Sequence, residues 1–162
     1  MKRRLLLSWV VAATGVALRA DDAQASPEAA AKDLLGGVRK FRADLSAANQ
    51  PTVTASQGRG VAEFHFDIAN ETISWTVSFE KLTSPVIAIT LHGPAQPGTN
   101  AASLMTLGRT PRESSITGRS GIGAGEVQYM LLGWTYVLIS TQRFPDGEVR
   151  GKVDIVPRTP QE

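Results

Sequence analysis

Apolar and polar residues alternate strictly along several short stretches of the chain. In residues 73–79, apolar side chains occupy every odd position, and Ser or Thr occupies every even position. Residues 39–45, 60–68 and 148–155 show the same period of two. Because successive side chains of a strand point to opposite faces, this pattern is typical of half-buried β-strands and argues against amphipathic helices there.

The remaining segments favour more strands and one helix. Residues 85–92 and 134–141 are apolar on both faces, which predicts interior strands. We expect a short strand at 102–107, an irregular Gly- and Ser-rich stretch at 108–125, and a helix at 126–132 that ends at Gly133.

Tight turns are predicted at residues 69–71 and 144–148, where Asn, Pro and Gly cluster. Short sequential strands joined by tight turns pair antiparallel. The sequence therefore predicts an all-β fold, an antiparallel β-sandwich or Greek-key barrel of seven or eight strands with one short helix.

The N-terminus has the layout of an export signal. Basic residues 2–4 precede a mostly apolar run of 14 residues, Leu5–Leu18, and Ala23 and Ala25 supply small residues for a signal peptidase. We expect residues 1–25 to be removed after Ala25, giving a periplasmic or secreted protein; a retained anchor is the alternative. The pair Arg3-Arg4 fits both an ordinary signal and a twin-arginine signal, so the export route stays open.

Composition excludes several classes of functional site. Cysteine is absent, which excludes disulfides, thiolate metal sites and a lipid-anchoring thiol. Removal of residues 1–25 would leave 13 basic and 13 acidic residues, so no net charge favours nucleic acid or an anionic membrane surface. We expect residues 26–37 to be a linker, 38–156 one domain, and 157–162 a tail, with no stable membrane anchor.

Few residues qualify as site candidates. His92 lies at a strand end before Gly93-Pro94, where we expect it to bond loop backbone. His65 is expected to be exposed, and it shares its face with Glu63 and Asp67, which fits either a solvated charged face or a weak cation site. With two histidines in the chain, a Ser–His–acid triad is not expected.

Two further motifs are read as structural. Glu148 and Arg150 follow a tight turn on one strand face, where we expect them to pair with each other or across strands. The run Gly121–Glu126 lacks the Lys-Ser/Thr of a phosphate-binding loop and is expected to be a flexible loop, with Glu126 opening a helix. No catalytic, cofactor-binding or metal-ligating residue is therefore predicted.

Two motifs carry a family resemblance. They are SPVIAITLHGPAQPG at 84–98 and WTYVLISTQRFPDGEVRG at 134–151, supported by residues 41–51 and 58–77. From about Val38 to Ile155 the chain resembles the CHRD domain family. That resemblance implies a β-sandwich similar in shape to copper–zinc superoxide dismutase. Many members carry two further histidines at the positions of Thr90 and Ser140, which would suit a metal; here only His92 remains.

These observations leave three functional hypotheses. The first is an exported, non-catalytic CHRD-type module that binds an unidentified protein or small molecule, or that has a structural role. Its partner surface is expected as an apolar patch on loops Pro94–Asn100 and Arg109–Gly125. The second is a copper- or zinc-binding protein, or a superoxide-dismutase-like enzyme, in which His92 and His65 converge. The third is an assembly module that pairs through an exposed sheet edge.

Overall fold

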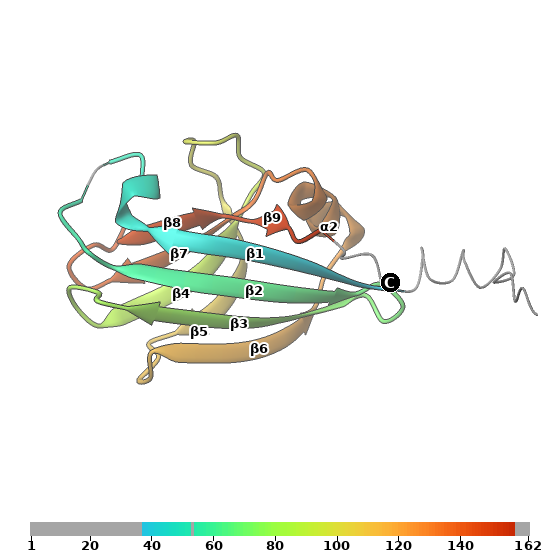
Figure 1. Cartoon of the computed structure of the whole chain (residues 1–162), viewed down its shortest axis with the longest axis horizontal. Helices are drawn as coiled ribbons and strands as arrows, with labels where there is room; N and C mark the ends of the chain where they lie inside the picture. The colour runs from blue at the N-terminus through green and yellow to red at the C-terminus, as the bar shows by residue number, and fades with distance from the viewer. Residues whose placement is uncertain (1–36, 53, 158–162) are drawn as a thin grey trace, which may run out of the picture.

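The protein forms a nearly closed antiparallel β-barrel with one α-helix (Figure 1). The computed structural model describes residues 37–52 and 54–157. The predicted signal peptide with its cleavage site at Ala25, nearly all of the linker and nearly all of the tail lie outside these ranges. The described elements are β1 (Val38–Ser46), the 3-10 helix η1 (Ala47–Asn49), β2 (Arg59–Asp67), β3 (Thr72–Glu80), β4 (Val86–His92), β5 (Ser103–Arg109), β6 (Ser115–Gly121), α2 (Ala124–Leu131), β7 (Tyr136–Thr141), β8 (Val149–Lys152) and β9 (Asp154–Ile155).

The strands form one sheet in the order β5-β4-β7-β8-β1-β2-β3-β6, and β9 pairs with β1. All of the strand pairs are antiparallel. After β5, the chain returns to pair β6 with β3, and α2 then carries it to β7 beside β4. These are Greek-key connections, so the all-β prediction with one short helix is confirmed.

Side chains join the two end strands of the sheet, β5 and β6. Trp75 of β3 lies against Gly118 of β6, where an added Cβ would be 2.3 Å from the indole ring. The indole Nε1 donates a hydrogen bond of 3.1 Å to the Leu107 carbonyl of β5. Ile116 of β6 packs against Gly108 of β5. Trp75 of β3 therefore connects to β5 across the seam of the barrel, the gap between the end strands β5 and β6.

The barrel interior follows from the alternation in the sequence. Along β1, β2 and β3 the apolar side chains that alternate with polar residues are buried, and the polar residues between them face outward. These apolar residues form one core with the inner faces of β4, β7 and β8. The inner residues of the first three strands are Phe41, Ala43, Leu45, Ala62, Phe64, Phe66, Ile73, Trp75 and Val77.

The prediction of an irregular stretch at 108–125 is wrong. β5 continues to Arg109, and residues 115–121 form β6, whose backbone pairs with β3 from Thr72–Gly121 to Ser78–Ser115. Because β6 is an edge strand with mostly exposed side chains, it shows no apolar alternation in sequence. The loop expected at Gly121–Glu126 is limited to residues 122–123, because Gly121 ends β6 and Ala124 begins α2.

The last strand is interrupted. We predicted one strand over 148–155, but it divides into β8 and β9 because the Val153 amide donates to the Thr135 carbonyl at 2.9 Å. Val153 is buried as expected, whereas Ile155 is 43% exposed. Among the described residues β9 pairs with β1 alone, so its other edge has no neighbouring strand.

Candidate functional site

Three side chains stack on the outer face of β4, β7 and β8. The guanidinium carbon of Arg150 lies 3.4 Å from the centroid of the Tyr136 ring. The Tyr136 ring in turn lies 5.0 Å from the His92 ring, with an angle of 10° between the ring planes. Strand register produces this stack, because His92 pairs directly with Tyr136 and both face outward.

The stack holds the loop that follows β4. Tyr136 Oη accepts a hydrogen bond from the Ala101 amide at 3.0 Å. Arg150 donates from Nη1 to Asn100 Oδ1 at 3.1 Å and from Nη2 to the Thr99 carbonyl at 2.5 Å. The loop predicted at Pro94–Asn100 is therefore folded over the outer face of the sheet and fixed at its far end.

His92 bonds loop backbone, as predicted from its position. Its Nδ1 lies 2.9 Å from the Ala101 carbonyl oxygen. Because a carbonyl oxygen only accepts, Nδ1 carries the hydrogen in this bond. Nε2 lies 2.7 Å from Thr90 Oγ1. Both ring nitrogens are thus hydrogen-bonded to protein, and neither presents a free lone pair to a metal ion.

His65 lies elsewhere on the barrel and is exposed, as expected. Three strands, β7, β8 and β1, separate its strand β2 from β4 in the sheet order. Its neighbour Glu63 pairs with Arg42 at 3.1 Å. Within residues 37–52 and 54–157, no group of three or more His, Cys, Asp or Glu residues lies close enough to hold a metal ion. The convergence that the metal hypothesis requires is not found in this part of the chain.

Asp67, the other acidic neighbour of His65, caps the turn before β3. It accepts hydrogen bonds from the Asn70 side chain at 2.8 Å and from the Ala69 amide at 3.0 Å. The Asn70 hydrogen bonds hold the pKa of Asp67 below its ordinary value. The carboxylate is therefore occupied by the turn.

Glu148 is fully buried. Of the two arrangements that the sequence left open, it does not pair with Arg150 but bonds to other segments. Its Oε1 accepts from Ser56 Oγ at 2.6 Å and from the Thr83 amide at 2.8 Å. Its Oε2 accepts from Thr83 Oγ1 at 3.1 Å and from Thr141 Oγ1 at 2.6 Å. The carboxylate thus joins the segments before β2, before β4 and at the end of β7.

Burial and hydrogen bonding act in opposite directions on Glu148. Burial raises the pKa of its carboxyl, but hydrogen bonds from Ser56, Thr141 and Thr83 outweigh that effect, so the pKa lies below its ordinary value. The charged form is therefore the one that the fold stabilises. Sequence reasoning missed this role because two of the three donor residues, Ser56 and Thr83, lie 92 and 65 residues away in the chain.

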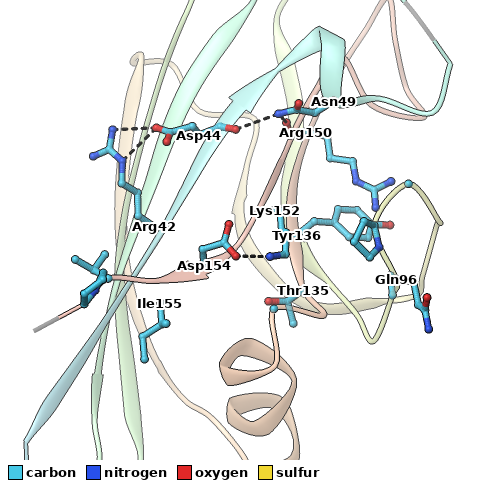
Figure 2. A pocket seen from close by; sticks show the side chains of 16 residues that line it. Arg42, Asp44, Asn49, Gln96, Thr135, Tyr136, Arg150, Lys152, Asp154 and Ile155 are labelled. Carbon is cyan, nitrogen blue, oxygen red and sulfur yellow. Dashed lines mark hydrogen bonds and ion pairs between the residues drawn. The ribbon is translucent and has the colours of Figure 1, made fainter.

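A cavity of about 600 Å³ opens beside the stack (Figure 2). Residues 95–98 of the loop line it on one side, and Gly133, Thr135 and Tyr136, at the start of β7, also line it. Side chains of β8, β9 and the outer face of β1 complete it. Its volume lies within the range of about 300–1,000 Å³ that is usual for small-molecule sites.

Two of the three cationic side chains that line the cavity form ion pairs in the described part of the chain, and the third does not. Arg42 binds Asp44 at 2.9 Å, and Lys152 binds Asp154. Arg150 is only 5% exposed, yet it takes part in none of the ion pairs found among the described residues. Burial lowers the pKa of the Arg150 guanidinium, an effect that Tyr136 opposes. The buried cation is held by a ring, a carbonyl and an amide oxygen.

Thr135 adds an unpaired polar group to the cavity lining. The residue is 2% exposed, and its Oγ1 has no hydrogen-bond partner among the described residues. In Figure 2 the Thr135 side chain is drawn next to the Lys152–Asp154 pair. A buried hydroxyl without a partner costs free energy, and Oγ1 is itself inaccessible from the cavity, so this group lowers stability and is not a binding group.

The exposed apolar surface differs from the one we expected. The large apolar side chains that are exposed in the described ranges include none from Pro94–Asn100 or Arg109–Gly125. They lie at the end of α2 and just after it, at Leu131, Leu132 and Trp134, and near the ends of β1 and β9. The expectation of an apolar patch on the two loops is therefore wrong, although residues 95–98 do line the cavity.

No helix in the described part of the chain is long and apolar enough to cross a membrane.

A comparison with known protein families confirms the resemblance that the two motifs indicated. The family model for the CHRD domain matches residues 41–153, more than two thirds of the 162 residues. Searches of curated proteins and of solved structures gave no significant match. The matched region contains every strand from β2 to β8, most of β1, and the whole His92–Tyr136–Arg150 stack. The chain belongs to the CHRD domain family.

Proposed function

We propose that this protein is an exported, non-catalytic CHRD-type module that binds a small molecule in the cavity beside the Arg150–Tyr136 stack. The observation that carries the proposal is the cavity itself, about 600 Å³ and open to solvent on a rigid sheet. Of the protein and small-molecule partners that the sequence left open, the cavity favours a small molecule.

The roles of the motif residues support binding rather than catalysis. Within the described ranges, His92 and Glu148 are held by protein hydrogen bonds that fix a loop and a set of segments. A catalytic acid or base needs to reach a proton of the substrate. Other residues of the two motifs, namely 95–98, Thr135, Tyr136 and Arg150, line the cavity.

The proposal that the protein is exported rests on its N-terminal sequence. The basic residues 2–4, the apolar run and the small residues at 23 and 25 support a cleaved signal. Expression of the full chain, followed by fractionation and N-terminal sequencing, tests this part. Export with a new N-terminus at Ser26 supports it, and retention of the uncleaved chain in the cytoplasm contradicts it.

A fragment screen followed by amide chemical shifts tests the cavity. We expect binding fragments to shift the amides of residues 95–98 and 133–136. Ala95→Phe places a ring in the cavity wall and should abolish these shifts, whereas Ala69→Phe, in the turn before β3, should leave them unchanged. Fragment binding that survives Ala95→Phe would locate the site elsewhere and contradict the proposal.

A further inference from the structure

Arg150 is the buried cation in the cavity that lacks a carboxylate. Its guanidinium has five N–H donors. Two of its hydrogen bonds reach Asn100 Oδ1 and the Thr99 carbonyl, and one face lies on Tyr136. An arginine held in this way keeps further N–H donors in a fixed plane, which is the arrangement that recognises planar anions.

The neighbouring charges leave this cation uncompensated. Arg42 and Lys152, the other two cations of the lining, are bound to Asp44 and Asp154. Because burying a charge without a counter-charge is costly, an anion that bound at Arg150 would recover part of that cost. The cavity therefore has an excess of one positive charge, located at its most buried cation.

The rest of the lining differs in character from the Arg150 end. Ile155 and Val156 line the cavity and are 43% and 38% exposed. A bare ion would leave this apolar surface unused, whereas an organic molecule with an apolar body would contact Ile155 and Val156.

We propose that the cavity binds a small organic carboxylate, whose carboxylate group pairs with Arg150 and whose apolar body lies on Ile155 and Val156. This inference rests on the proposed function, because it assigns the ligand class of the same cavity. Carboxylate is favoured over phosphate or sulfate because the apolar rim and the moderate volume suit a molecule with one planar charged end.

Paired probes test the charge requirement in the unmodified protein. Hexanoate and benzoate are compared with hexanamide and benzamide, which have nearly the same shape and no charge. Titration followed by amide chemical shifts should show the carboxylates binding about tenfold more tightly than the amides, a difference of about 1.4 kcal/mol. The shifts should fall on residues 95–98 and 133–136.

Substitutions then test Arg150. Arg150→Gln should weaken hexanoate binding about tenfold more than it weakens hexanamide binding, because only the carboxylate loses its charge partner. Arg119→Gln, which removes the same charge from the exposed surface of β6, should change neither. Arg150→Lys, which keeps the charge but loses the planar fork, serves if Arg150→Gln does not fold, and it should weaken hexanoate binding by a smaller factor.

Three results would overturn the inference. Equal binding of amides and carboxylates would show a cavity for neutral ligands, so the ligand class would fail and the proposed function would survive. Binding of inorganic phosphate or sulfate alone would exclude the organic carboxylate. An absence of shifts in the cavity with every probe and with the wider fragment screen would remove both the inference and the proposed function.

Discussion

Arg150 lies flat against Tyr136, with 3.4 Å between the guanidinium carbon and the centroid of the ring. The two residues come from adjacent strands, β8 and β7, and from the two ends of the second family motif. Each also binds the loop after β4, Arg150 at Thr99 and Asn100, and Tyr136 at Ala101. The stacked pair therefore connects β7 and β8 to the loop that follows the first motif.

Two substitutions of Tyr136 separate the ring from its hydroxyl. Tyr136→Phe keeps the stack and loses the hydrogen bond from the Ala101 amide, which should cost about 1 kcal/mol in the free energy of unfolding. Tyr136→Leu also removes the cation–π and aromatic contacts, so we expect a loss of about 3 kcal/mol. Urea denaturation measures both. Equal losses for the two variants would mean that the stack contributes nothing.

Glu148→Gln tests the buried carboxylate. The amide keeps the shape of the side chain, but its NH₂ group faces hydrogen-bond donors from Ser56, Thr83 and Thr141. We expect the variant to lose about 1–3 kcal/mol in the free energy of unfolding. Glu63→Gln is the matched control, because its exposed pair with Arg42 should contribute no more than about 1 kcal/mol. Equal losses for the two variants would contradict a structural role for Glu148.

The pH dependence of stability should carry the signature of Glu148. Its pKa in the folded protein is lowered, so the unfolded chain binds the proton more readily at acidic pH. The stabilisation is fully present above the unfolded pKa, about 4.3, and is lost as the pH falls through the lower folded value. Denaturation midpoints from pH 7 to pH 3 should fall less steeply in Glu148→Gln. Parallel curves for the two proteins would contradict the lowered pKa.

The sequence predicted some elements well because their cause is local. Along β1, β2 and β3, one face of each strand is buried. Burial of one face requires apolar residues at every second position, and this alternation predicts the strands from the sequence. The role of His92 was also predictable, since a histidine between a strand end and Gly-Pro has loop backbone within reach. Family motifs then extended the prediction to the whole domain.

Other elements could not be predicted because their cause is distant. β6 forms through a backbone ladder with β3 and leaves its own side chains exposed, so no apolar pattern marks it. Glu148 lies on the polar side of an alternating pattern, yet its side chain is buried. It accepts hydrogen bonds from donors at residues 56, 83 and 141. The cavity combines β1, β8, β9 and two loops, and no local pattern in sequence brings these together.

Metal addition should not stabilise the protein. Both ring nitrogens of His92 are hydrogen-bonded, one to Thr90 and one to Ala101, so a zinc or copper ion would have to break these bonds to bind. We expect the melting temperature to stay unchanged when either metal is added. His92→Phe should keep the stack on Tyr136 and lose about 1–2 kcal/mol in the free energy of unfolding, with or without metal. Stoichiometric zinc or copper in the protein purified without a tag would contradict this expectation.

Closure of the barrel depends on a glycine that makes room for Trp75. A Cβ at position 118 would lie 2.3 Å from the indole ring, so Gly118→Ala must displace the ring and weaken its hydrogen bond to the Leu107 carbonyl. We expect a loss of about 1–3 kcal/mol in the free energy of unfolding. Gly121→Ala, on the same strand, meets no atom within 4 Å and should stay within about 0.5 kcal/mol of the unmodified protein. Hydrogen exchange should also rise in β5 of Gly118→Ala, because Trp75 bridges to that strand; unchanged exchange there would show that the seam is held without it.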